Sequence, residues 1–174
     1  MKKITSSVKL KVLLGLTIIG FFTHFQTLKF GLFGDDWLAI YVYTSQDVSG
    51  GFFGPLPGIL KYLTEYGAQV LMTGAFYSIF RHNYFYYYLI SLLFKIAASF
   101  SIYLVVTKIS GKKTNNLLPY LSAIFLLVGL TGIQTTDFIV QMGVFLAAAF
   151  SFLSIYLLIN AIQSHSKIFL FLAL

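Results

Sequence analysis

The chain has no cysteine and few charged residues. The absence of cysteine from its 174 residues excludes disulfides and thiolate metal sites. Only 10% of the residues are charged, whereas a soluble domain carries roughly a quarter. Acidic residues are the scarcest, with 5 against 12 basic ones. Metal-binding histidine spacing, phosphate-cradling glycine loops and nucleophile elbows are also absent.

What the chain has instead is apolar sequence. Hydrophobic residues make up 58% of it and aromatic residues 18%, and the mean hydropathy is +0.85. This composition predicts an all-α integral membrane protein. The net charge of +7 does not indicate nucleic acid, because the lysines flank apolar runs, as topology signals and anionic-lipid contacts do. They are Lys2, Lys3, Lys9, Lys11, Lys108, Lys112, Lys113 and Lys167.

The apolar runs predict one transmembrane domain over residues 1–174, with four complete helices and a truncated fifth. A spanning helix needs about 20 mostly apolar residues. The four predicted spans are residues 12–33, 84–106, 117–133 and 138–162. Residues 168–174 begin a fifth apolar run that is too short to cross a bilayer. We therefore expect the sequence to be the N-terminal part of a longer membrane domain.

The segment between the first two spans predicts interfacial helices. Residues 50–58 are rich in glycine and proline, which indicates a loop. Residues 59–80 are apolar but are interrupted by Lys61, Glu65 and Gln69, which favours helices lying in the interface over a spanning helix. The lysine distribution then predicts a multi-pass plasma-membrane protein with a cytoplasmic N-terminus, and all five acids on the outer side.

Two of these acids, Asp35 and Asp36, are adjacent and follow the first apolar run directly. Carboxylates are costly at a membrane boundary unless they bind or react with something. One interpretation is a helix N-cap followed by Trp37 as an interface anchor. The other is a catalytic or metal-binding pair, in which one carboxylate acts as a general base on a hydroxyl and the second holds a cation or positions the first.

Several motifs resemble those of GT-C glycosyltransferases, the polytopic class that includes protein O-mannosyltransferases and lipid A aminoarabinose transferases. Gly34-Asp35-Asp36-Trp37 resembles the acidic motif that these enzymes carry in their first outer loop. Residues 76–84 are similar to the pattern F-x-x-F-G-x-N-x-x-x-Y, with Arg81 where glycine is usual. Asp137 resembles a second acid between the third and fourth helices. The chain departs from the class at residues 66–68, Tyr-Gly-Ala, where an Arg-Pro pair is often found.

The resemblance implies an inverting enzyme that transfers a sugar from a polyprenyl-phosphate donor to an acceptor on the outer face. Asp35 would be the general base that deprotonates the acceptor. Asp36 and Asp137 would orient groups or, with Asp35, hold a divalent cation, for which carboxylates and water suit magnesium or manganese. The implied partners are the lipid-linked sugar donor and membrane lipids, without nucleic acid.

Three basic side chains are candidates for the donor phosphate. Arg81 and His82 adjoin the tyrosine-rich start of the second span, where they either meet a lipid phosphate or act as snorkelling anchors. Lys95 lies within that span, where a charge contacts donor phosphate or forms a structural ion pair. Alternative functions are a transporter or flippase fragment and a non-catalytic membrane scaffold. Acids at the boundary, in a long loop, favour the enzyme.

Overall fold

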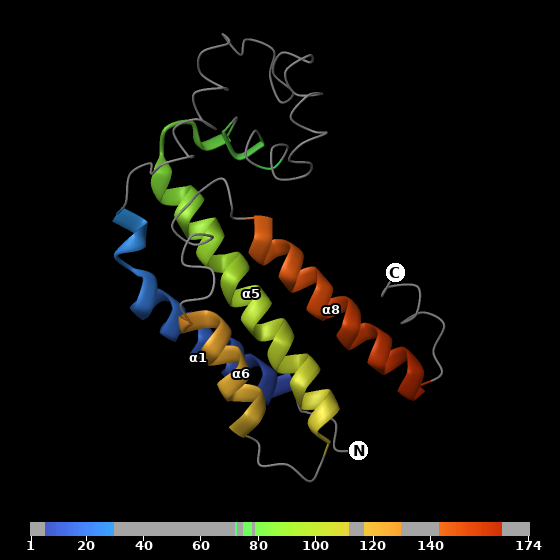
Figure 1. Cartoon of the computed structure of the whole chain (residues 1–174). Coiled ribbons are helices and arrows are strands. Elements are labelled where there is room, and N and C mark those ends of the chain that lie inside the picture. Colours follow the sequence, from blue (N-terminus) through green and yellow to red (C-terminus); the bar gives the residue numbers. More distant parts are fainter. Residues whose placement is uncertain are drawn as a thin grey trace, which may run out of the picture. The chain divides into compact units, whose positions relative to one another are not determined.

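The computed structural model describes residues 6–29, 72, 75–77, 79–111, 117–129 and 143–164. The regular elements in these ranges are all helical (Figure 1): α1 (Ser6–His24), the short 3-10 helix η1 (Thr27–Lys29), α5 (Tyr84–Ser110), α6 (Leu117–Val128) and α8 (Gly143–Ser164). The chain divides into two compact units. Unit 1 comprises Met1–Thr23, Leu93–Thr131 and Phe145–Leu174, and unit 2 comprises His24–Leu92 and Gly132–Val144.

Among the described residues, three helices are long and apolar enough to cross a membrane: Ser7–His24 within α1, α5 and α8. At 1.5 Å per residue, the 27 residues of α5 extend about 40 Å. The 12 residues of α6 extend only about 18 Å, less than the roughly 30 Å hydrocarbon core. The predicted all-helical fold is therefore confirmed for the described residues, which include three helices of spanning length. The predicted span over 117–133 continues beyond the described residues, and the truncated fifth run over 168–174 lies outside them, so both stay predictions.

The predicted bounds of the first span, 12–33, are wrong at both ends. The helix α1 begins at Ser6 and ends at His24. Lys9 and Lys11 fit within its first turns because lysine is a good helix former whose long side chain can extend away from an apolar stem. At the other end, the Thr23 hydroxyl donates to the carbonyls of Ile19 and Gly20, at 2.8 and 3.3 Å. The chain then tightens into η1, so Lys29 lies beyond the helix.

The helix α5 begins at Tyr84, as its aromatic belt predicts, and continues past residue 106 to Ser110. Its end is followed by Gly111 at φ 63°, a left-handed conformation that glycine adopts without steric cost and that ends helices. Lys108 therefore belongs to the last turn of the helix, although the sequence places it in a turn. The start of α6 at Leu117 agrees with the sequence, and Pro119 falls in its first turn, where proline is tolerated.

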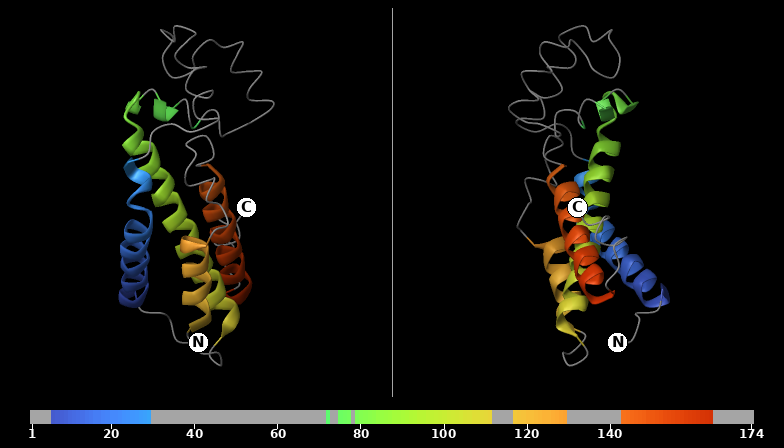
Figure 2. Two further views of the ribbon diagram at one scale, coloured as in Figure 1. Left: turned by 60° about the vertical axis from the view of Figure 1, so that its left-hand side comes forward. Right: turned by 90° about the vertical axis from the view of Figure 1, so that its right-hand side faces the viewer.

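The core of unit 1 contains small residues that let helices approach closely. Ala98 of α5 is fully buried and packs with Phe145 and Ala149 of α8. A Cβ atom on Gly20 of α1 would lie 3.1 Å from Ile96 Cγ1 and 3.3 Å from Leu127 Cδ1. Small residues at such contacts are typical of helix packing in membranes. Figure 2 shows α6 beside α5, consistent with the packing of Leu126 against this core.

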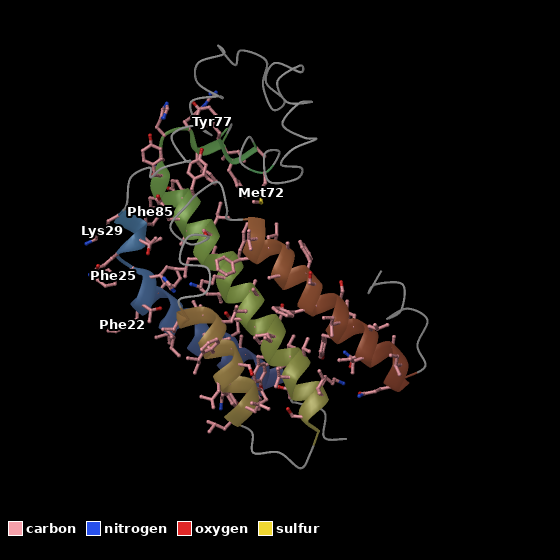
Figure 3. The ribbon with its side chains drawn as sticks, viewed as in Figure 1. Phe22, Phe25, Lys29, Met72, Tyr77 and Phe85 are labelled. Carbon is pink, nitrogen blue, oxygen red and sulfur yellow. The ribbon has the colours of Figure 1, made fainter. Side chains whose placement is uncertain are left out.

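The outer surface of the unit 1 helices is apolar. Ile18 and Phe22 of α1 are 69% and 81% exposed, and Phe125 of α6 is 71% exposed. Phe22 projects away from its helix in Figure 3. Large apolar surfaces of this kind are rare on soluble monomers. The exposed apolar residues of α1, a helix of spanning length, support contact with lipid.

Unit 2 has an aromatic core. Tyr77, Tyr87 and Tyr88 are buried together. Partly buried apolar side chains pack around them, from Leu28, Met72, Phe76, Phe80, Tyr84 and Ile90. Residues 72, 75–77 and 79–80 are helical, as predicted for the segment 59–80. Whether that segment lies in the interface stays a prediction.

Candidate functional site

Arg81 occupies a left-handed turn that ends one helical segment before α5 begins. Its φ is 50°, a conformation uncommon for residues other than glycine. The Arg81 amide donates to the Tyr77 carbonyl at 2.9 Å, the bond of an αL helix cap. The Asn83 amide donates to the Phe80 carbonyl at 2.9 Å. The backbone therefore reverses within residues 81–83 and leads into α5.

Aromatic side chains hold this turn in place. The Tyr87 hydroxyl donates to the Arg81 carbonyl at 2.9 Å, and Tyr87 is fully buried. The Phe80 ring stacks on Tyr86 at 5.1 Å and meets Tyr87 edge-on at 5.9 Å. A buried tyrosine needs a partner for its hydroxyl. The Arg81 carbonyl supplies that partner, so the start of α5 is tied to the turn that precedes it.

The side chains of Arg81 and His82 are exposed and lie against tyrosine rings. The Arg81 guanidinium carbon is 5.7 Å from the centroid of Tyr77, within the range of a cation–π contact. The His82 ring meets Tyr77 edge-on at 5.8 Å, and its Nδ1 is 3.5 Å from the Tyr84 hydroxyl. The structure thus brings two of the three predicted basic residues together. Guanidinium and imidazole N–H groups that face outward can donate to phosphate oxygens.

Lys95 lies in unit 1 and is fully buried. Its Nζ atom is 5.3 Å from the centroid of the Phe145 ring of α8, so the ammonium group has an aromatic neighbour. One turn further along α5, the buried Ser99 hydroxyl has no hydrogen-bond partner in the structure. Ser91, one turn before Lys95, is also fully buried. A spacing of four residues puts all three polar side chains on one face of α5.

The predicted acidic site lies outside the described residues. This holds for Asp35, Asp36 and Asp137, and for the divalent cation that they would bind. In the described ranges, no group of three potential metal-ligating side chains occurs. The catalytic roles of the three aspartates therefore stay predictions.

Sequence reasoning missed the two tyrosines that shape the turn. It interpreted residues 84–88 as a uniform aromatic belt, whereas Tyr87 and Tyr88 are buried and Phe85 and Tyr86 are exposed. Tyr87 follows Asn83 by four residues, as the last tyrosine follows the asparagine in the pattern F-x-x-F-G-x-N-x-x-x-Y. That spacing could have singled out Tyr87. The four-residue spacing of Ser91, Lys95 and Ser99 could likewise have predicted that these polar residues share one face of α5.

No protein-family model, curated protein or solved structure matches the chain.

Proposed function

We propose that this protein is a membrane glycosyltransferase that transfers a sugar from a polyprenyl-phosphate donor to an acceptor on the outer face. The observation that carries the proposal is the basic turn before α5, where Arg81 and His82 are exposed and lie against tyrosine rings. A phosphate at a membrane surface needs donors held at its level, and arginine pairs well with phosphate oxygens. The aromatic contacts restrict both side chains before the phosphate arrives, which reduces the entropy lost on binding.

The left-handed backbone at Arg81 supports the resemblance on which the proposal rests. Glycine is usual at this position of the pattern, and the observed φ of 50° is one that glycine adopts most readily. The Tyr87 hydroxyl donates to the Arg81 carbonyl. When the pattern is aligned on Arg81 and Asn83, its last tyrosine falls on Tyr87, beyond the segment 76–84 that carries the resemblance. The spacing of the pattern therefore has a structural reason in this chain.

The proposed chemistry assigns the proton transfer to Asp35. Its carboxylate takes the proton of the acceptor hydroxyl as that oxygen forms its bond to the anomeric carbon. The bond from this carbon to the phosphate oxygen breaks, and the polyprenyl phosphate leaves with the electron pair. Attack from the face opposite the phosphate inverts the anomeric centre. Asp36 and Asp137 orient these groups or hold a magnesium or manganese ion.

The decisive variant is Asp35→Asn, because asparagine keeps the size and capping ability of aspartate but loses its basic oxygen. Loss of a general base lowers rates by about a hundred- to ten-thousand-fold. Transfer of a radiolabelled sugar should be measured in membranes that contain matched amounts of the wild-type and variant proteins, each expressed at full length. Asp47→Asn is the control, an acid of the same loop with no assigned role. Near-wild-type transfer by Asp35→Asn would refute the base assignment and support the helix-cap interpretation.

The proposed topology has four complete spans and the start of a fifth helix, with a cytoplasmic N-terminus and the aspartates outside. The lysine asymmetry supports it. A membrane-impermeant thiol reagent added outside intact cells should label cysteine in Ser45→Cys and spare it in Ser110→Cys. The chain has no native cysteine to interfere. The reverse labelling pattern would overturn both the topology and the outward-facing enzyme.

One observation favours a transporter or flippase as a second candidate. Lys95 is a fully buried charge within a helix of spanning length, and such residues often mark substrate or ion pathways. A transporter predicts that Lys95→Met abolishes lipid flipping in proteoliposomes while Asp35→Asn leaves it intact. The glycosyltransferase predicts that Asp35→Asn abolishes sugar transfer.

A further inference from the structure

Two lysines from different helices converge on one tyrosine ring in unit 1. Lys9 Nζ of α1 is 5.7 Å from the centroid of the Tyr156 ring of α8, and Lys108 Nζ of α5 is 5.8 Å from the same centroid. Lys9 Nζ also donates to the Tyr156 hydroxyl at 3.3 Å. The two ammonium groups are therefore no farther apart than the sum of the two centroid distances, and they repel each other.

No carboxylate of the described residues balances this charge, since all five acids of the chain fall outside those ranges. Lys9 Nζ lies at the hydroxyl edge of the ring and not over its face. A cation–π contact is weak at partly exposed sites, so the ring offsets little of the repulsion between the two cations. All three side chains are partly exposed, so a ligand can reach them. An anion placed beside both ammonium groups would remove the repulsion and be attracted to each of them.

The chemistry of the three groups matches a phosphodiester. Each ammonium group carries three N–H donors, and the Tyr156 hydroxyl, which accepts from Lys9, still has its own hydrogen to donate. Lys9 lies in the first turns of α1, and Lys108 lies in the last turn of α5. The ends of spanning helices lie at the level of lipid headgroups.

We infer that Lys9, Lys108 and Tyr156 form a binding site for the phosphodiester headgroup of an anionic phospholipid. The site joins α1, α5 and α8 within unit 1, so a bound lipid links the three helices. It is separate from the basic turn at Arg81 and does not depend on the proposed glycosyltransferase activity.

The test measures lipid binding to the purified full chain in detergent micelles, with phosphatidylglycerol and phosphatidylcholine as probes and native mass spectrometry as the readout. The wild-type protein should retain phosphatidylglycerol in preference to phosphatidylcholine. Lys9→Gln and Lys108→Gln should each weaken phosphatidylglycerol binding by about fivefold, the effect of one basic residue at an anionic surface. Tyr156→Phe keeps the ring and should reduce binding less. Lys9→Arg keeps the charge and should retain binding, which separates loss of the site from misfolding.

Lys11→Gln is the matched control, because Lys11 is an exposed lysine of the same helix and its loss changes the net charge equally. If Lys11→Gln weakens binding as much as Lys9→Gln, the attraction is diffuse surface charge and the inference is overturned. Equal retention of the two lipids by the wild-type protein also overturns it. Millimolar inorganic phosphate should not displace the lipid, and complete displacement would identify a site for free phosphate instead.

Discussion

The helices α5 and α8 are almost equally apolar, yet they have different surroundings. In the most apolar stretch of α5, 56% of the residues are buried, whereas in the corresponding stretch of α8 only 17% are buried. The buried positions of α5 also include polar residues, namely Ser91, Lys95, Ser99 and Ser101. Hydropathy thus identifies a helix that can cross a membrane, but the polar residues distinguish the central helix from a peripheral one. Polar side chains are costly against lipid and are kept where protein surrounds them.

If α5 is the more buried of the two helices, the largest loss of stability is expected for a buried aromatic residue of α5. Tyr87→Ala in α5 should destabilise the protein by about 3–5 kcal/mol, because it leaves a cavity and removes the donor to the Arg81 carbonyl. Phe150 of α8 is 60% exposed, and Phe150→Ala should change stability by no more than about 0.5 kcal/mol. Thermal denaturation in detergent micelles measures both. Similar losses for the two variants would show that α8 is as buried as α5.

A smaller effect is expected where α5 meets α1. Gly20→Leu should cost about 1–3 kcal/mol, because any side chain there meets Ile96 and Leu127. A Cβ atom on Gly15 would have no other atom within 4 Å. Gly15→Leu should therefore stabilise α1 by up to about 1 kcal/mol through helix propensity. The same denaturation measurement applies, and a stable Gly20→Leu protein would contradict the close packing of α1 on α5.

The smallest effect on stability is expected at the turn before α5. Arg81→Gly relieves a left-handed conformation that costs roughly 1–2 kcal/mol, while the extra freedom of glycine in the unfolded chain offsets part of this gain. The melting temperature should change by only a few degrees. Donor binding should weaken about ten- to a hundredfold if Arg81 bonds the phosphate, the range for a hydrogen bond to a charged group. An unchanged KM for the donor would leave Arg81 with a purely structural role.

The sequence predicts the elements of this fold better than their packing. The starts of α5 and α6 follow from local signals, namely the tyrosine-rich run at Tyr84 and the polar segment before Leu117. The end of α1 at His24 was missed because the apolar run continues through a region where side-chain bonding by Thr23 and the η1 turn compete with the helix.

The candidate site was predictable only in part. Arg81 and His82 are exposed and lie beside aromatic residues, as their polar side chains and their position next to the tyrosine-rich run predict. The left-handed conformation of Arg81 was not predicted as such, because it depends on the Tyr87 hydroxyl, which lies six residues away and is oriented by the aromatic core. The convergence of Lys9 and Lys108 on Tyr156 joins residues up to 147 positions apart, and no local pattern encodes it.

A left-handed residue follows the last turn of α5, and another ends the helical segment that precedes it. Arg81 precedes α5 with φ 50°, and Gly111 follows it with φ 63°. The left-handed backbone at Gly111 disfavours extension of α5 beyond Ser110. The helix length of about 40 Å exceeds the roughly 30 Å thickness of a hydrocarbon core, so in a bilayer we expect α5 to tilt or to expose its ends. We then expect thinner or thicker bilayers to change the inclination of α5 more than its length.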